Sequence, residues 1–121
     1  MLYDIFLICP VCNATPEQKA KMQKYIEDIE SQGKKIYYPA RDTNQNDKTG
    51  FNICRKNMEA IYNYFEVHIF WDKDSQGSLF DLGMAFALYK PLTIVNIDDV
   101  IPTESKSFSN MVLKWNEKHQ E

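Results

Sequence analysis

The hydrophobic residues of this chain occur either in short continuous runs or at helical spacing. The continuous runs predict buried strands at residues 3–8, 34–39, 66–71 and 91–96. Apolar residues three or four positions apart within polar stretches predict helices at residues 16–32, 51–64, 79–90 and 105–119. This alternation predicts one α/β domain of the doubly wound, flavodoxin-like or Rossmann-like kind. Its sheet is expected to be mainly parallel, with roughly four or five strands and helices on both faces.

The first two helices show which side chains are expected to face the core. Thr15, Pro16 and Gln18 form an N-terminal capping pattern for the first helix, and Gly33 suits its end. The expected inner residues of the first helix are Ala20, Met22, Ile26 and Ile29. Those of the second are Ile53, Met58, Ile61 and Tyr62.

Parallel strands joined by right-handed crossovers bring the loops after the strands to one edge of the sheet, where ligands bind in such folds. The loops concerned are 9–14, 40–50 and 72–77. Arg41 in the second loop is a natural partner for a phosphate or carboxylate. With Ser78 as the predicted N-cap of the third helix, Asp81 lies on its first turn. There it either complements the helix dipole or points into a pocket.

Composition narrows the class of protein. The chain has 121 residues, 44% of them hydrophobic, and a net charge of −3. It therefore suits one globular domain and disfavours nucleic-acid polymers and membrane surfaces as partners. No apolar run reaches the roughly 20 residues of a membrane span, and the N-terminus lacks the features of a signal peptide. The three cysteines are an odd number, so we expect reduced thiols and a cytoplasmic location.

Residues 75–91 have the pattern S-x-G-S-x-x-D-L-G-x-A-x-A-L-x-K-P after a predicted strand. With the first strand and its loop (IFLICP), the polar loop after the second strand and the segment NMEAI, this pattern resembles the nucleoside 2-deoxyribosyltransferase superfamily. That superfamily includes the 2′-deoxynucleoside 5′-monophosphate N-glycosidases. The resemblance covers residues 4 to about 96.

The resemblance implies an enzyme that cleaves the bond between C1′ and the base through a carboxylate nucleophile, with hydrolysis or transfer to follow. Asp81 matches the nucleophile, although the family usually has Glu there. Phe6 stands where the family has a tyrosine, and Asn57 stands in place of a second acid. The implied substrate-binding residues are Cys9, Pro10, Arg41, Asp42, Asn57, Ser75, Gly77, Ser78 and Ser109.

Among these, Ser75, Gly77 and Ser109 are expected to hold phosphate or sugar, Asn57 the sugar, and Arg41 with Asp42 the base or phosphate. The implied partners are a small nucleoside or nucleotide and further copies of the chain in a homodimer or larger homo-oligomer. The apolar side of the last helix is a candidate interface. No metal or organic cofactor is implied.

Two other functions are compatible with the sequence. The first is a non-catalytic nucleotide-binding module on the same fold, with its chemistry lost through the three departures from the family pattern. The second is a thiol oxidoreductase, because Cys9 and Cys12 form a C-x-x-C motif directly after the first strand. A low thiol pKa in that motif needs a helix N-terminus, and the capping residues place the helix start several positions later.

Overall fold

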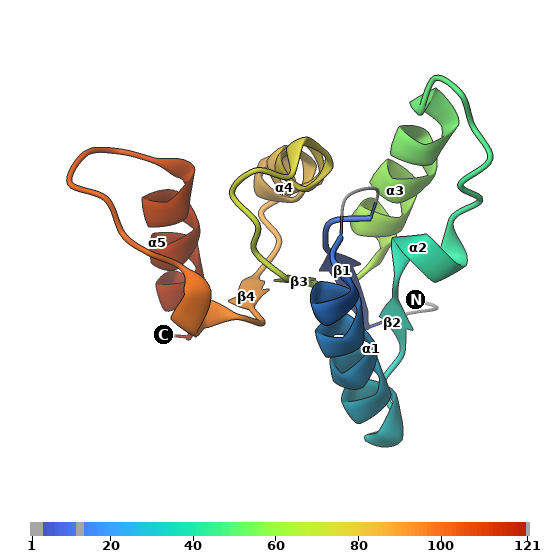
Figure 1. The fold of residues 1–121 in the computed structure, drawn as a ribbon, viewed down its shortest axis with the longest axis horizontal. Coiled ribbons are helices and arrows are strands. Elements are labelled where there is room, and N and C mark those ends of the chain that lie inside the picture. Colours follow the sequence, from blue (N-terminus) through green and yellow to red (C-terminus); the bar gives the residue numbers. More distant parts are fainter. Residues whose placement is uncertain (1–3, 12–13, 121) are drawn as a thin grey trace.

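The computed structural model describes residues 4–11 and 14–120, and Figure 1 shows its helices and strands. The elements in chain order are β1 (Ile5–Ile8), α1 (Pro16–Ser31), β2 (Ile36–Tyr37), α2 (Pro39–Asp42), α3 (Phe51–Asn63), β3 (Glu66–Ile69), α4 (Gln76–Ala87), β4 (Leu92–Ile94), the 3-10 helix η1 (Ile97–Asp99) and α5 (Phe108–Gln120).

The four strands form one parallel sheet in the order β2-β1-β3-β4. The chain places β2 on one side of β1 and then β3 and β4 on the other side, so the strand order reverses at β1. Helix α1 covers one face of the sheet, and α3 and α4 cover the opposite face (Figure 1). This confirms the predicted α/β doubly wound fold with a parallel sheet and helices on both faces.

Each face of the sheet has its own hydrophobic core. On the α1 side, Ile5, Leu7 and Ile36 pack against Met22, Ile26 and Ile29 of the helix. On the other side, the strands contribute Phe6, Ile8, Tyr37, Val67, Ile69, Leu92 and Ile94, which pack against residues of α3 and α4 such as Ile61, Leu82 and Ala85. The alternation of side chains along β1 therefore supplies both cores.

The N-terminus of α1 forms as its sequence predicts. The Thr15 hydroxyl accepts a hydrogen bond from the Gln18 N–H, and the Gln18 side chain accepts one from the Thr15 N–H. Gly33 follows the helix with a φ of 83°, a left-handed conformation that suits glycine. Of the predicted inner residues, Met22, Ile26 and Ile29 are buried, whereas Ala20 is exposed.

The structure corrects the rotation of α3 about its axis. Its buried residues are Asn57, Ala60 and Ile61, whereas Met58 and Tyr62, both predicted to face inward, are exposed. More apolar residues occur along this helix than one inner stripe can hold, so part of the set faces solvent. The second strand is also shorter than predicted, because Pro39 is already the first residue of α2.

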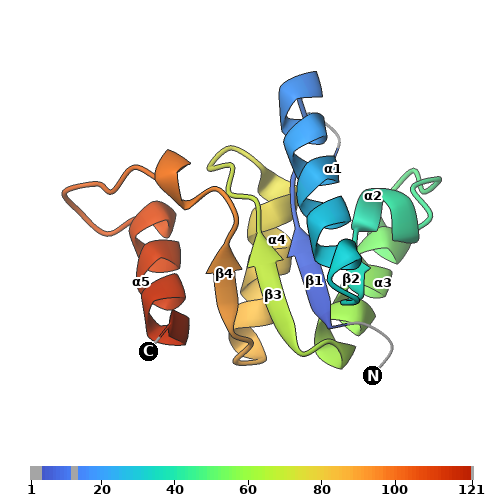
Figure 2. The same ribbon diagram turned by 90° about the horizontal axis from the view of Figure 1, so that it is seen from below.

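Helix α5 lies beside β4, at the edge of the sheet (Figure 2). Val112 is fully buried in the core on the α3–α4 side, and Trp115 makes an edge-to-face contact with Phe86 of α4. None of the helices in residues 4–11 and 14–120 combines the length and the apolar character that crossing a lipid bilayer requires.

Candidate functional site

Asp81 lies on the second turn of α4, because this helix begins earlier than predicted. Ser75 is the N-cap: its hydroxyl oxygen accepts from the Ser78 N–H at 3.2 Å. Ser78, the predicted cap, is instead a buried residue of the first turn, and its Oγ accepts from the Ser75 hydroxyl at 2.9 Å. Asp81 is therefore too far along the helix to cap it.

The Asp81 carboxyl group lies in the seam between α4 and α3. Burial raises its pKa from 3.8 to about 7, and a side-chain hydrogen bond with Asn57 of α3 acts in the opposite direction. The nearby Cys9 thiol follows β1, and burial together with the Asp81 charge raises its pKa to about 12. Asp81, Asn57 and Cys9 thus lie close together near the carboxyl end of β1, and their role in a binding site stays a prediction.

Asn57 connects Asp81 to two residues that the sequence did not identify. The Thr43 hydroxyl donates to Asn57 Oδ1 at 2.9 Å, and the Tyr37 hydroxyl lies 2.6 Å from Thr43 Oγ1. These residues are largely buried, so the chain of hydrogen bonds satisfies polar atoms inside the fold. A buried tyrosine usually needs a partner for its hydroxyl, which is the signal that could have identified Tyr37.

The other predicted site residues are distributed more widely. Pro10 is buried after β1, Gly77 is exposed at the start of α4, and Ser109 is half-buried in α5. Ser109 lines a hollow of about 450 Å³ together with Trp71 and Asp72, and Asp81 does not line it. Ser109 and Asp81 therefore do not line the same hollow, and the binding roles of Ser75, Gly77 and Ser109 stay predictions.

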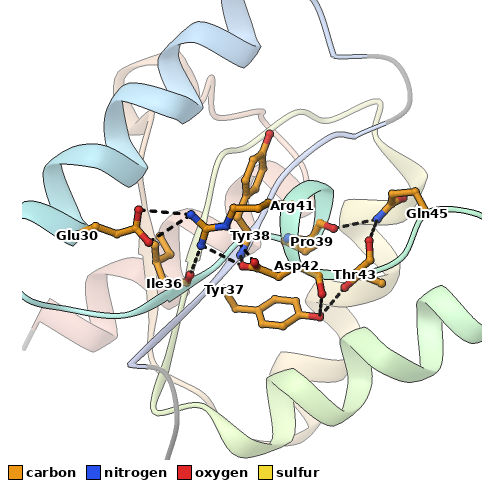
Figure 3. A network of polar contacts seen from close by, with 9 residues as sticks. All are labelled: Glu30, Ile36, Tyr37, Tyr38, Pro39, Arg41, Asp42, Thr43 and Gln45. Atoms are coloured by element: carbon orange, nitrogen blue, oxygen red, sulfur yellow. Dashed lines mark hydrogen bonds and ion pairs between the residues drawn. The ribbon is translucent and has the colours of Figure 1, made fainter.

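Arg41 and Asp42 are bound to each other and to the edge of β2 (Figure 3). Arg41 also donates through Nη1 to Glu30 and through Nη2 to the Ile36 carbonyl, so each of its three guanidinium nitrogens has an acceptor. A phosphate would have to displace one of these acceptors. The binding role of this pair stays a prediction, and the contacts give it a structural role.

Two adjoining hollows lie between α1 and the loops after β3 and β4. The second has a volume of about 360 Å³ and shares Lys21, Phe70, Asn96 and Asp99 with the first. Lysines and aspartates both line their walls, so neither hollow has one sign of charge. Within the described ranges, no cluster of three or more His, Cys, Asp or Glu side chains is arranged to hold a metal ion.

A second polar cluster lies on the α1 side of the sheet. The Tyr25 hydroxyl is 2.5 Å from His68 Nδ1, and His68 Nε2 is 3.0 Å from Glu66 Oε1. The other oxygen of Glu66 is 3.7 Å from Nε2 of His119 on α5. Burial lowers the pKa of His68. The cluster therefore joins α1, β3 and α5 through polar side chains.

The outer surface of α3 and α4 is the main feature that the sequence did not reveal. We call it the α3–α4 surface. It is defined by the exposed residues Phe51, Met58, Tyr62, Phe65, Phe80, Phe86 and Tyr89. Tyr62 is 66% exposed, Phe65 70% and Phe80 57%. The sequence feature that could have indicated this surface is the number of apolar residues in the second predicted helix, which exceeds what one buried stripe holds.

Comparison with solved structures shows which known fold this chain is similar to. The chain is similar to the TIR domain of the Toll-related receptor TRR-2 from Hydra magnipapillata, with a TM-score of 0.61 and 18% sequence identity. The match covers 89% of this chain and 78% of the receptor domain. The shared feature is the fold. No family model matches the sequence. No curated protein matches it either.

This comparison overturns the predicted family. The similar structure is a TIR domain and not a nucleoside 2-deoxyribosyltransferase, so assignment to that superfamily and the N-glycosidase or transferase activity were wrong. The motif residues have packing roles instead: Leu82 and Ala85 lie in the core, and the Lys90 ammonium donates to the Tyr64 carbonyl at 2.7 Å.

The oxidoreductase interpretation was also wrong. A TIR-like fold does not support it, and Cys9 is buried with a pKa that opposes formation of the reactive thiolate. Helix α1 begins only at Pro16, so Cys9 gains nothing from a helix N-terminus. Cys12 lies outside the described residues. Of the predicted functions, the non-catalytic module fits best, without support for a nucleotide or another small molecule as its partner.

Proposed function

We propose that residues 1–121 act as a single non-catalytic association module that binds further copies of itself through the α3–α4 surface. One observation carries this proposal. Ten large hydrophobic side chains are exposed among the described residues, and seven of them lie on or directly after α3 and α4. Large exposed apolar side chains concentrated on neighbouring elements of a protein are typical of a protein interface.

The charges of α4 favour a second copy as the partner. Asp81 is the only ionisable residue between Gln76 and Ala87, and it is turned toward α3. The outward residues of α4 include Phe80, Gly83 and Ala87, none of which carries a charge. Two copies related by a two-fold axis bring the same surface together twice, and here α4 would meet α4 without repulsion between like charges.

The aromatic composition also supports this proposal. Phenylalanine, tyrosine and methionine are enriched in protein interfaces, and the aromatic rings bury a large apolar area there. The similar solved structure is a domain of a receptor, which supports a proposal of action by association. In this proposal Asp81 and Asn57 hold the seam beneath the surface together.

The test is a comparison of two charge-introducing variants by sedimentation velocity over a range of protein concentrations. Phe80→Asp places a charge in the proposed interface, and we expect it to weaken self-association roughly tenfold or more. Ile101→Asp is the matched control, because Ile101 is also highly exposed but lies outside the α3–α4 surface. A wild-type protein that stays monomeric at high concentration contradicts the proposal, as does an equal effect of both variants.

A further inference from the structure

The two outer strands of the sheet leave backbone groups directed away from their neighbours. In β2, the Lys35 carbonyl accepts from the Ile5 N–H at 3.1 Å, so residues 35 and 37 face β1. Alternate residues of a strand point their hydrogen-bonding groups to opposite sides. The backbone groups of Ile36 and Tyr38 therefore point outward, where another strand could pair with them.

The Arg41–Asp42 pair occupies these outward groups (Figure 3). Arg41 Nη2 donates to the Ile36 carbonyl at 2.9 Å, and Asp42 Oδ2 accepts from the Tyr38 N–H at 2.9 Å. In a parallel sheet, a single residue of a neighbouring strand makes these two bonds with its own N–H and C=O groups. The two side chains thus take the place of one residue of a further strand.

Several contacts hold the pair in this position. Arg41 Nε and Nη2 lie 2.9 and 3.0 Å from the two oxygens of Asp42, and Arg41 Nη1 lies 3.2 Å from Glu30 Oε2 on α1. The hydrogen bond with Asp42 is the main reason that the pKa of Arg41 is raised. Helix α2 follows β2 directly, so the backbone brings both side chains back to the strand they cover.

The opposite edge is closed in a comparable way by α5. The Val95 N–H donates to the Ile69 carbonyl of β3, so the backbone groups of Ile94 point outward. Asn116 Oδ1 accepts from the Ile94 N–H at 2.8 Å, and the Trp115 indole N–H donates to the Lys90 carbonyl at 2.9 Å. Side chains in register with outward backbone groups therefore protect both edges.

We propose that the Arg41–Asp42 pair closes the β2 edge against pairing with the β2 edge of a second copy of this chain. Two copies related by a two-fold axis would place these edges antiparallel, and the outward groups of Ile36 and Tyr38 would bond across the axis. The pair prevents this and leaves the α3–α4 surface as the place of association. This closure does not depend on the α3–α4 proposal, because it concerns a different surface.

The experiment uses a Phe80→Asp background, in which association through the α3–α4 surface is weakened. Arg41→Ala with Asp42→Ala removes both side chains from the edge. Lys73→Ala with Asp74→Ala is the matched control, because it removes another adjacent ion pair, exposed in the loop after β3, and keeps the Arg41–Asp42 pair. We expect the Arg41–Asp42 variant to show concentration-dependent assembly in sedimentation and the control to behave like the background. At low concentration, amide exchange at Tyr38 should be roughly tenfold or more faster in the Arg41–Asp42 variant, because a bond to a charged acceptor is lost.

Two results would overturn the proposal. One is a folded Arg41–Asp42 variant that sediments like the background at every concentration. The other is measured on the wild-type protein and so does not depend on the variant's folding. If the Tyr38 amide exchanges as fast as an unprotected amide, the edge is not closed.

Discussion

The two helical layers of this protein are alike on their inner sides and different on their outer sides. Helix α1 packs Met22, Ile26 and Ile29 against the sheet, and its outward residues are almost all polar or charged: Glu17, Lys19, Lys21, Gln23, Lys24, Glu27, Asp28 and Glu30. The α3–α4 layer also buries an apolar stripe, but it shows solvent a second set of aromatic residues. Covering a sheet requires only the inner stripe. The outward aromatic residues therefore need an explanation outside the fold, and association provides one.

The largest expected effect tests whether the buried sides of the two layers contribute equally to the stability of the fold. Ile26→Ala in α1 and Ile61→Ala in α3 each remove a fully buried side chain. We expect each to lower the free energy of unfolding by about 2–5 kcal/mol, through lost burial and the cavity that remains. Denaturant unfolding measures both. If only one of the two destabilises the protein, the layers do not contribute equally to the fold.

The next largest effect is the pH dependence of stability, which should differ between the two layers. Asp81 has a pKa of about 7 when folded and 3.8 ordinarily, so the folded state binds the extra proton and loses stability as the pH rises from about 4 to beyond 7. We expect Asp81→Asn to abolish this loss. At pH 8 the variant should be more stable than wild type by up to about 4 kcal/mol, the equivalent of this pKa difference. Denaturant unfolding at pH 5 and pH 8 provides the measurement. Equal pH dependence in the two proteins would show that Asp81 is not the group responsible.

The α1 side should respond to pH in the opposite direction and more weakly. Burial lowers the pKa of His68 below 6.5, although Glu66 acts to raise it and His119 and Lys34 add to the lowering. The unfolded state therefore binds more protons, and His68 costs stability as the pH falls below about 6.5. His68→Gln should reduce the loss between pH 7 and pH 5, with thermal unfolding as the measurement. The Tyr25 hydroxyl also faces His68, so the pH profile of a Tyr25→Phe variant is measured alongside that of His68→Gln. An unchanged pH profile in His68→Gln would count against this assignment.

The sequence predicted the alternation of elements, the parallel sheet and the capped start of α1, because these depend on local patterns and on the chemistry of single caps. It did not predict the rotation of α3, since the apolar residues of this amphipathic helix span a wider arc than the sheet covers, and periodicity alone cannot select the buried ones. The start of α4 was also misplaced, because Ser75 and Ser78 can both cap a helix and only the folded loop decides between them.

The candidate site was less predictable than the fold. That Asp81 and Asn57 meet follows from the packing of α3 on α4, and that Arg41 turns back to Ile36 depends on the short turn of α2. The motif around Asp81 suggested an enzyme family, yet its Leu82 and Ala85 are explained by the core. A short pattern of small and apolar residues in a helix can result from packing in the core as readily as from a catalytic role.

The most direct test of association through the α3–α4 surface is hydroxyl-radical footprinting of the wild-type protein at low and high concentration. We predict that Met58, Tyr62 and Phe80 become protected as the concentration rises, because they enter the interface. Phe108, which is similarly exposed but lies at the start of α5, should keep its reactivity. Protection of Phe108 with no change at Met58, Tyr62 and Phe80 would contradict the account.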